Sequence, residues 1–91
     1  MILEIVTPEA TLYKGEVEAV TVPGIDGEFQ ILNNHAAIVS LLGKGTIKIK
    51  GNIAIGEEFA SKFGTVNGDK TLEINSGTIE MNDNKIIILA D

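Results

Sequence analysis

The chain has 91 residues, the length of a single domain, and 44% of them are hydrophobic. It has no cysteine, which excludes a disulfide framework and a thiolate metal site. Its 13 acidic and 7 basic residues give a formal net charge of −6, which disfavours nucleic-acid phosphates and anionic lipid as partners, and no apolar run reaches the about 18 residues of a membrane-spanning helix.

Short apolar runs separated by turn residues recur along the whole chain, from Leu3-Glu4-Ile5 onward. Clean alternation, as in residues 46–50 and 71–75, predicts strands with one buried face. The expected strands are 3–5, 11–14, 16–22, 28–32, 46–50, 71–75, 79–81 and 86–89, with 36–42 either strand or irregular core and a return strand at 53–55 after the Gly51-Asn52 turn. Many short strands at this spacing are typical of an all-β sandwich or barrel.

The expected strand at residues 16–22 changes phase. Val17 and Ala19 have one parity, whereas Val20 and Val22 have the other. A shift by one residue turns side chains to the opposite face of a sheet. The pattern therefore predicts either a bulge near Ala19-Val20 or a strand that is buried on both faces.

One segment has helical spacing. Ile55, Phe59 and Phe63 recur every four residues. We therefore predict one short helix near residues 56–63, about two turns long, which has to pack on the sheet to be stable.

The stretch from Val20 to Leu42 contains the only histidine and two turn signals, Pro23-Gly24 and Asn33-Asn34-His35. A single histidine has no second histidine with which to build a metal site, and a His-based catalytic triad has a low prior, so His35 is interpreted as a structural or interface residue. Asp26 and Glu28 lack the spaced oxygen ligands of an EF-hand loop and are expected to face solvent.

Gly43-Lys44-Gly45-Thr46 resembles a phosphate-binding loop only in part. A glycine separates the lysine from the threonine and the upstream glycine is missing, so the segment is interpreted as a hairpin turn. The residues alone thus predict a non-catalytic interaction domain with no catalytic residues, metal or cofactor, and they leave its partner open. Two rival classes are a stand-alone binding module, such as a carbohydrate-binding sandwich with exposed aromatic platforms, and a small β-fold enzyme with several convergent ionisable groups.

An ordered set of motifs resembles the N-terminal domain of the ATP synthase epsilon subunit, which is called delta in mitochondria. The resemblance begins with Leu3-Glu4-Ile5-Val6-Thr7-Pro8 and Tyr13-x-Gly15, and it is strongest in V-P-G-x-x-G-E-F-Q-I-L-x-x-H-A, residues 22–36. It continues through Leu42-x-x-Gly45-x-Ile47-x-Ile49 and finishes with Ser76-Gly77-x-Ile79-Glu80 and Ile88-Leu89-Ala90-Asp91. Nearly the whole chain is covered, as a single domain over residues 1–91.

The resemblance implies a flattened β-sandwich of about ten short strands. It also implies a central-stalk subunit without an active site, bound to the gamma subunit and resting on the ring of membrane c subunits. Such a rotor subunit turns with the ring and helps to couple ion flow to ATP synthesis. Its expected place is the cytoplasmic face of the bacterial inner membrane, as a peripheral part of the complex without membrane insertion of its own.

Two contact surfaces are carried over by matching positions. The surface expected to face the polar loops of the c ring consists of Gly24, Ile25, Asp26, Gly27 and Glu28. The surface expected to face gamma consists of His35, Ala36, Ile38 and Ser40. The residues between them, Phe29, Ile31 and Leu32, are expected to be core, and Ile38 is expected to be at least partly exposed.

The sequence departs from the family pattern at two places. The usual Pro-Gly-His-Ala-Pro element reads Asn33-Asn34-His35-Ala36-Ala37, so the loop lacks the prolines that would stiffen it. Residues 51–70 are longer than the usual hairpin. The family commonly adds a C-terminal helical hairpin, and the chain stops at Asp91, so we expect a naturally short subunit that neither inhibits by helix insertion nor holds nucleotide. Stabilisation by nucleotide in a thermal melt would contradict this expectation.

Overall fold

The computed structural model describes residues 1–91 as ten strands and one 3₁₀ turn. The elements in chain order are β1 (Ile2–Val6), β2 (Thr11–Glu16), β3 (Ala19–Gly24), β4 (Gly27–Leu32), β5 (Ile38–Leu42), β6 (Gly45–Lys50), η1 (Ala60–Lys62), β7 (Phe63–Val66), β8 (Asp69–Ile74), β9 (Gly77–Asn82) and β10 (Lys85–Ala90). The all-β fold of about ten short strands that the sequence predicts is confirmed.

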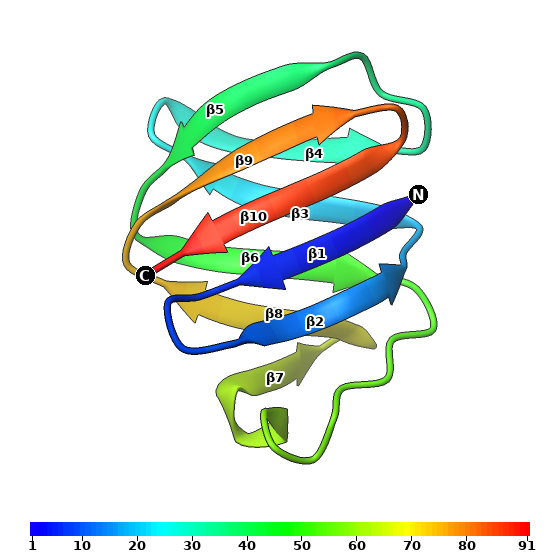
Figure 1. The fold of residues 1–91 in the computed structure, drawn as a ribbon, viewed down its shortest axis with the longest axis vertical. Helices are drawn as coiled ribbons and strands as arrows, with labels where there is room; N and C mark the ends of the chain where they lie inside the picture. Colours follow the sequence, from blue (N-terminus) through cyan, green and yellow to red (C-terminus); the bar gives the residue numbers. More distant parts are fainter.

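The strands form two layers that are joined at one corner (Figure 1). The first layer, here called the β1 layer, has the order β2-β1-β10-β9-β5, and the second, the β3 layer, has the order β4-β3-β6-β8-β7. Strands β1 and β10 run parallel, and the other neighbours are antiparallel. The two layers join where Gly24 of β3 pairs with Leu42 of β5.

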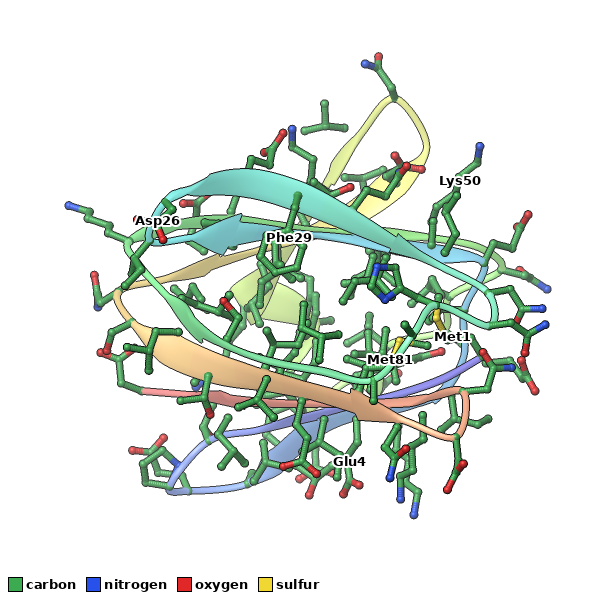
Figure 2. The ribbon with its side chains drawn as sticks, turned by 90° about the horizontal axis from the view of Figure 1, so that it is seen from above. Met1, Glu4, Asp26, Phe29, Lys50 and Met81 are labelled. Atoms are coloured by element: carbon green, nitrogen blue, oxygen red, sulfur yellow. The ribbon has the colours of Figure 1, made fainter.

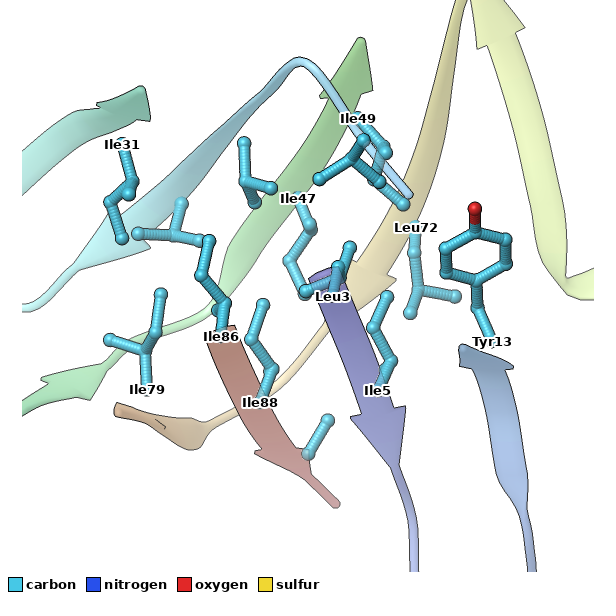
Figure 3. Packing of buried hydrophobic residues seen from close by; sticks show 14 of the residues in the cluster. Leu3, Ile5, Tyr13, Ile31, Ile47, Ile49, Leu72, Ile79, Ile86 and Ile88 are labelled. Atoms are coloured by element: carbon cyan, nitrogen blue, oxygen red, sulfur yellow. The ribbon is translucent and has the colours of Figure 1, made fainter. Parts of the chain in front are cut away.

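The core fills the space between the layers and is entirely apolar, since no polar or charged side chain is buried. Alternate residues of the central strands point inward, and the sheet pleat places them on one face. Figure 3 shows Leu3, Ile5, Ile86 and Ile88 of the β1 layer opposite Ile47 and Ile49 of the β3 layer, and all six are fully buried. Burial of one such side chain contributes about 1.5–3 kcal/mol, so this interface is the main source of stability.

Strand β3 is buried on both faces at its first two residues. Ala19 and Val20 are adjacent and both buried. Their register is unbroken, because Ala19 pairs with Leu32 and Lys50 on either side. The bulge considered for this place is therefore wrong, and its alternative, a strand buried on both faces, holds at Ala19-Val20 but not at Thr21 and Pro23, which are half-buried. The register shift lies instead between β1 and β2, where Ile5 pairs with Tyr13 and Val6 with Thr11, so Leu12 has no partner.

The helical spacing near residues 56–63 gives only the 3₁₀ turn η1, Ala60–Lys62, instead of a two-turn α-helix. Ile55, Phe59 and Phe63 still pack against the core, as the spacing implies. A helix of two turns gains too few hydrogen bonds to offset its nucleation. The exposed edge of β8 offers the chain a ladder instead, so Phe63–Val66 becomes strand β7.

The hairpin expected at Gly43-Lys44-Gly45-Thr46 is also wrong. This segment links β5 to β6, and residues 75–76 link β8 to β9, but neither pair of strands is hydrogen-bonded together. Each link crosses from one layer to the other. The expected return strand at 53–55 is irregular, and its Ile53 and Ile55 pack against the core from the loop. Turn residues reveal that the chain reverses, but they do not reveal which strand it then joins.

The Tyr13-x-Gly15 motif has a packing reason. The Tyr13 hydroxyl donates to the carbonyl of Glu16 at 3.1 Å, which lays the ring across Gly15. A Cβ on Gly15 would lie 2.7 Å from that hydroxyl. Burial raises the pKa of Tyr13, and the charge of Glu16 raises it further.

We predict that Gly77→Ala destabilises the fold by about 1–3 kcal/mol, because the added Cβ would lie 2.5 Å from the Leu89 carbonyl oxygen in the paired strand β10. Gly56→Ala is the matched control, since nothing lies within 4 Å of its added Cβ. Urea denaturation measures both. Equal midpoints for the two variants would contradict the close approach of β9 and β10.

Candidate docking surfaces

The turn between β3 and β4 is a two-residue hairpin. Gly24 pairs with Gly27, which leaves Ile25 and Asp26 at the tip. Gly27 has a φ of +128°, which only glycine adopts without strain. The Ile25 backbone N–H donates to the Leu41 carbonyl at 3.3 Å, so the tip is fastened to β5 in the other layer. The sequence-predicted set from Gly24 to Glu28 therefore forms one compact projection.

The two acidic residues of this turn differ in their surroundings. Glu28 forms an ion pair with Lys48 of β6 at 3.4 Å, and both side chains are about half exposed. Such an exposed pair is worth at most about 1 kcal/mol. Asp26 takes part in none of the three ion pairs of the structure and is exposed at the tip. Figure 2 shows Asp26 at the extreme end of the layers. Asp26 is thus the free negative charge of this surface.

The second predicted set begins in the loop between β4 and β5. His35 and Ala36 are both exposed. The His35 N–H donates to the Leu32 carbonyl at 3.1 Å and closes a four-residue turn, and Nδ1 of the imidazole lies 2.7 Å from the Ala36 carbonyl oxygen. Because a carbonyl oxygen only accepts, Nδ1 is the donor in this contact.

Strand β5 alternates in burial along its length. Ile38 and Ser40 are half-buried and Leu42 is buried, and Ile38 packs against the core. The expectation that Ile38 is partly exposed is confirmed. The outward positions of β5 are Val39 and Leu41, which are 79% and 57% exposed. These two residues were missed from the sequence because the run from Ala36 to Leu42 is apolar throughout and hides the alternation.

Strand β4 brings one correction to the expected core. Ile31 is fully buried and Phe29 is half-buried against the core, and Figure 2 shows the Phe29 ring directed between the layers. Leu32 is 54% exposed, so its assignment to the core is wrong. Because Ile31 points inward, the pleat turns its neighbour outward.

The outward residues of β5 belong to a wider apolar surface. Leu41 and Leu89 flank Thr78 from the two strands beside β9, and Ile25 at the hairpin tip lies close by. We call Ile25, Val39, Leu41 and Leu89 the apolar face; each is more than half exposed. Beside it lies an open hollow of about 610 Å³ that Ile25, Leu41 and Leu89 help to line. Contiguous exposed apolar side chains of this kind mark interaction sites.

Charges stand at the rim of the apolar face. Glu80 is the cross-strand neighbour of Val39. The Asp91 carboxylate accepts a hydrogen bond from the Ser76 backbone N–H at 3.0 Å, and this bond holds the pKa of Asp91 below its usual value. The carboxyl group is therefore ionised at neutral pH.

Two kinds of feature are absent from the structure. No group of three or more His, Cys, Asp or Glu side chains is placed to hold a metal ion. No helix of the structure is long and apolar enough to cross a membrane. The candidate docking surfaces are the hairpin tip and the apolar face, together with the His35 loop.

The fold is that of an all-β sandwich. A family model described as the beta-sandwich domain of the ATP synthase delta/epsilon chain matches residues 1–91, so the chain belongs to this family, and the resemblance seen in its motifs is confirmed.

The relatives in sequence are bacterial. The chain is 39% identical over 89 residues to the ATP synthase epsilon chain of Leptospira interrogans, and 38% identical over 89 residues to that of Campylobacter concisus. Each match covers 98% of this chain and 59% of the relative. The chain thus spans about three fifths of the length of the curated relatives that it matches.

Two solved structures share the fold. One is the central stalk and c ring of the Tetrahymena thermophila mitochondrial ATP synthase, with a TM-score of 0.75 and 19% identity over 99% of this chain and 62% of that chain. The other is the OSCP/F1/c-ring assembly of the Euglena gracilis mitochondrial ATP synthase, with a TM-score of 0.76 and 22% identity over 99% of this chain and 49% of that chain.

We predict that Val39→Thr changes the free energy of unfolding by less than about 0.5 kcal/mol, whereas Ile38→Thr lowers it by about 1–2 kcal/mol. The two residues are neighbours on β5 and both are replaced by threonine, so the variants differ in the direction of the side chain and in the one extra carbon that isoleucine loses. Thermal or urea unfolding measures both. If Val39→Thr lowered the free energy of unfolding more than Ile38→Thr does, this would show that Val39, and not Ile38, points toward the core.

Proposed function

We propose that the chain is a non-catalytic central-stalk subunit of a rotary ATP synthase, which links the gamma subunit to the c ring and helps to couple ion flow to ATP synthesis. The observation that carries the proposal is the family match over all of residues 1–91. Its place would be peripheral, at the cytoplasmic face of the bacterial inner membrane. The absence of convergent ionisable groups from the described surfaces is compatible with a subunit that carries no chemistry.

The proposed c-ring contact is the hairpin tip, Gly24 to Glu28. It projects from one end of the sandwich, and its backbone is held by the Gly24–Gly27 pair and by the bond from Ile25 to Leu41. Its free charge is Asp26, because Glu28 is already paired with Lys48. Charges at the rim of an interface contribute more to register and specificity than to affinity.

The proposed gamma contact comprises His35, Ala36, Ile38 and Ser40, to which we add Val39 and Leu41, the outward residues of β5 in the apolar face. His35 and Ala36 are exposed, and Ile38 and Ser40 offer only part of their surface. Val39 and Leu41 lie on the same strand and point outward, so they supply the apolar area that an interface needs at its centre. Strand β4 joins the hairpin tip to the His35 loop, and its six residues place that loop about 20 Å from the tip.

We predict that Asp26→Lys and Glu28→Lys weaken assembly with the c ring while the chain remains folded. Each reverses a charge on the hairpin tip, and Glu28→Lys also places a second cation beside Lys48. Glu58→Lys is the control, since it makes the same charge change in the exposed loop before η1. Co-purification with the c ring measures assembly. Unchanged yields for both tip variants would remove the c-ring assignment.

We also predict that Leu41→Lys lowers the affinity for gamma about tenfold or more, because it puts a charge into the centre of an apolar contact. Val66→Lys is the control: Val66 is equally exposed but lies on β7 at the far edge of the β3 layer. Titration of labelled gamma measures both. If a folded wild-type chain did not bind gamma, the role of a stand-alone binding module would replace the proposal.

A further inference from the structure

Two turns that are far apart in sequence meet at one end of the sandwich. The turn at Leu32–His35 leads out of β4 in the β3 layer, and the turn at Asn82–Lys85 joins β9 to β10 in the β1 layer. Figure 1 shows both beside the N-terminus. Asn84 connects them: its Nδ2 donates to Oδ1 of Asn33 at 2.8 Å, and its Oδ1 accepts from the backbone N–H of Asn34 at 2.7 Å.

The left-handed backbone conformation of Asn84 does not depend on hydrogen bonds made by its side chain. Asp83 and Asn84 have φ values of 50° and 59°, as in the two-residue hairpin turns that fit the twist of paired strands. Asparagine tolerates this left-handed region, and glycine adopts it freely. The Asn84 carbonyl also accepts the N–H of Ile2 at 3.1 Å. The side chain is therefore available to bind the neighbouring loop.

The loop has few other restraints. Residues 33–37 are all exposed and belong to no strand. Their remaining hydrogen bonds are local, from the His35 N–H to Leu32 and between His35 and Ala36. The two bonds to Asn84 are thus the only hydrogen bonds that tie the loop to another part of the chain. The loop also has no proline to restrict it.

We propose that Asn84 is a positioning residue for the gamma contact, which fixes the loop so that His35 and Ala36 stand in one orientation at the end of the apolar face. The partner in this inference rests on the proposed function; the restraint itself does not. A loop that is ordered before binding loses less entropy when it binds, so the restraint raises affinity without touching the partner.

The decisive variant is Asn84→Gly. Glycine accepts the positive φ, so the hairpin is kept while both side-chain bonds are removed. We expect amide exchange at Asn34 to become about threefold to tenfold faster, the affinity for gamma to fall by a similar factor, and the thermal midpoint to change little. Asn67→Gly is the matched control, because Asn67 has a φ of 52° in the β7–β8 turn and makes no side-chain hydrogen bond.

A second variant separates the two bonds. Asn84→Asp keeps an acceptor for the Asn34 N–H but loses the donor to Asn33. It should restore the slow exchange of the Asn34 amide and part of the affinity for gamma. A merely structural role for Asn84 predicts instead that affinity follows global stability across the variants.

The outcomes distinguish the possible failures. Unchanged exchange at Asn34 in Asn84→Gly would overturn the restraint. Faster exchange with unchanged affinity for gamma would overturn the positioning role. Failure of the wild-type chain to bind gamma would overturn the proposed function and with it the role of Asn84, whereas the exchange data would still decide whether the restraint exists.

Discussion

The contact between the two layers is the interaction on which the rest of the structure depends. It contains apolar side chains and no charged one, and the hydroxyl of Tyr13 at its edge donates to the Glu16 carbonyl. An apolar interface of this kind supplies stability but little direction, since dispersion and the hydrophobic effect do not depend on orientation. The register of the strands is therefore set by alternation along each strand and by the turns at its ends. The same division leaves every charged side chain outside the core, whereas the candidate binding residue Ile38 packs partly against it.

The corner between β3 and β5 turns this sandwich into a support for binding surfaces. Gly24 pairs with Leu42 there, and the next residue on each strand, Ile25 and Leu41, shares a further hydrogen bond. The hairpin tip and the apolar face thus rest on the same corner. Within each layer the ladder of β3 with β4 and that of β5 with β9 are continuous, and the corner joins the two layers at the Gly24–Leu42 pair.

Much of this fold could be predicted from the sequence, because alternation reports directly on burial. Thr46 to Lys50 alternates in sequence and in the structure, and the hairpin turn at Asp83-Asn84 lies where turn residues predict it. The failures have a common cause. Leu32 and Val39 are apolar but point outward. A rule based on hydrophobicity assigns such residues to the core, because it does not distinguish an exposed apolar surface from a buried one. The spacing of Phe59 and Phe63 reports their burial correctly but not the backbone that buries them.

The β4–β5 loop shows why hydrogen bonds between residues far apart in the chain could not be predicted from the sequence pattern. Taken alone, Asn33-Asn34 is a loss of stiffness relative to a proline-flanked loop, and Asn84 is an ordinary turn residue. Folded together, the three asparagines share two hydrogen bonds across the layers. Proline restrains a loop by narrowing its own backbone angles, whereas the asparagines restrain it by attachment to a neighbouring hairpin. Attachment restrains the loop only if the β9–β10 hairpin itself has a fixed position. The parallel pairing of β10 with β1 fixes that position.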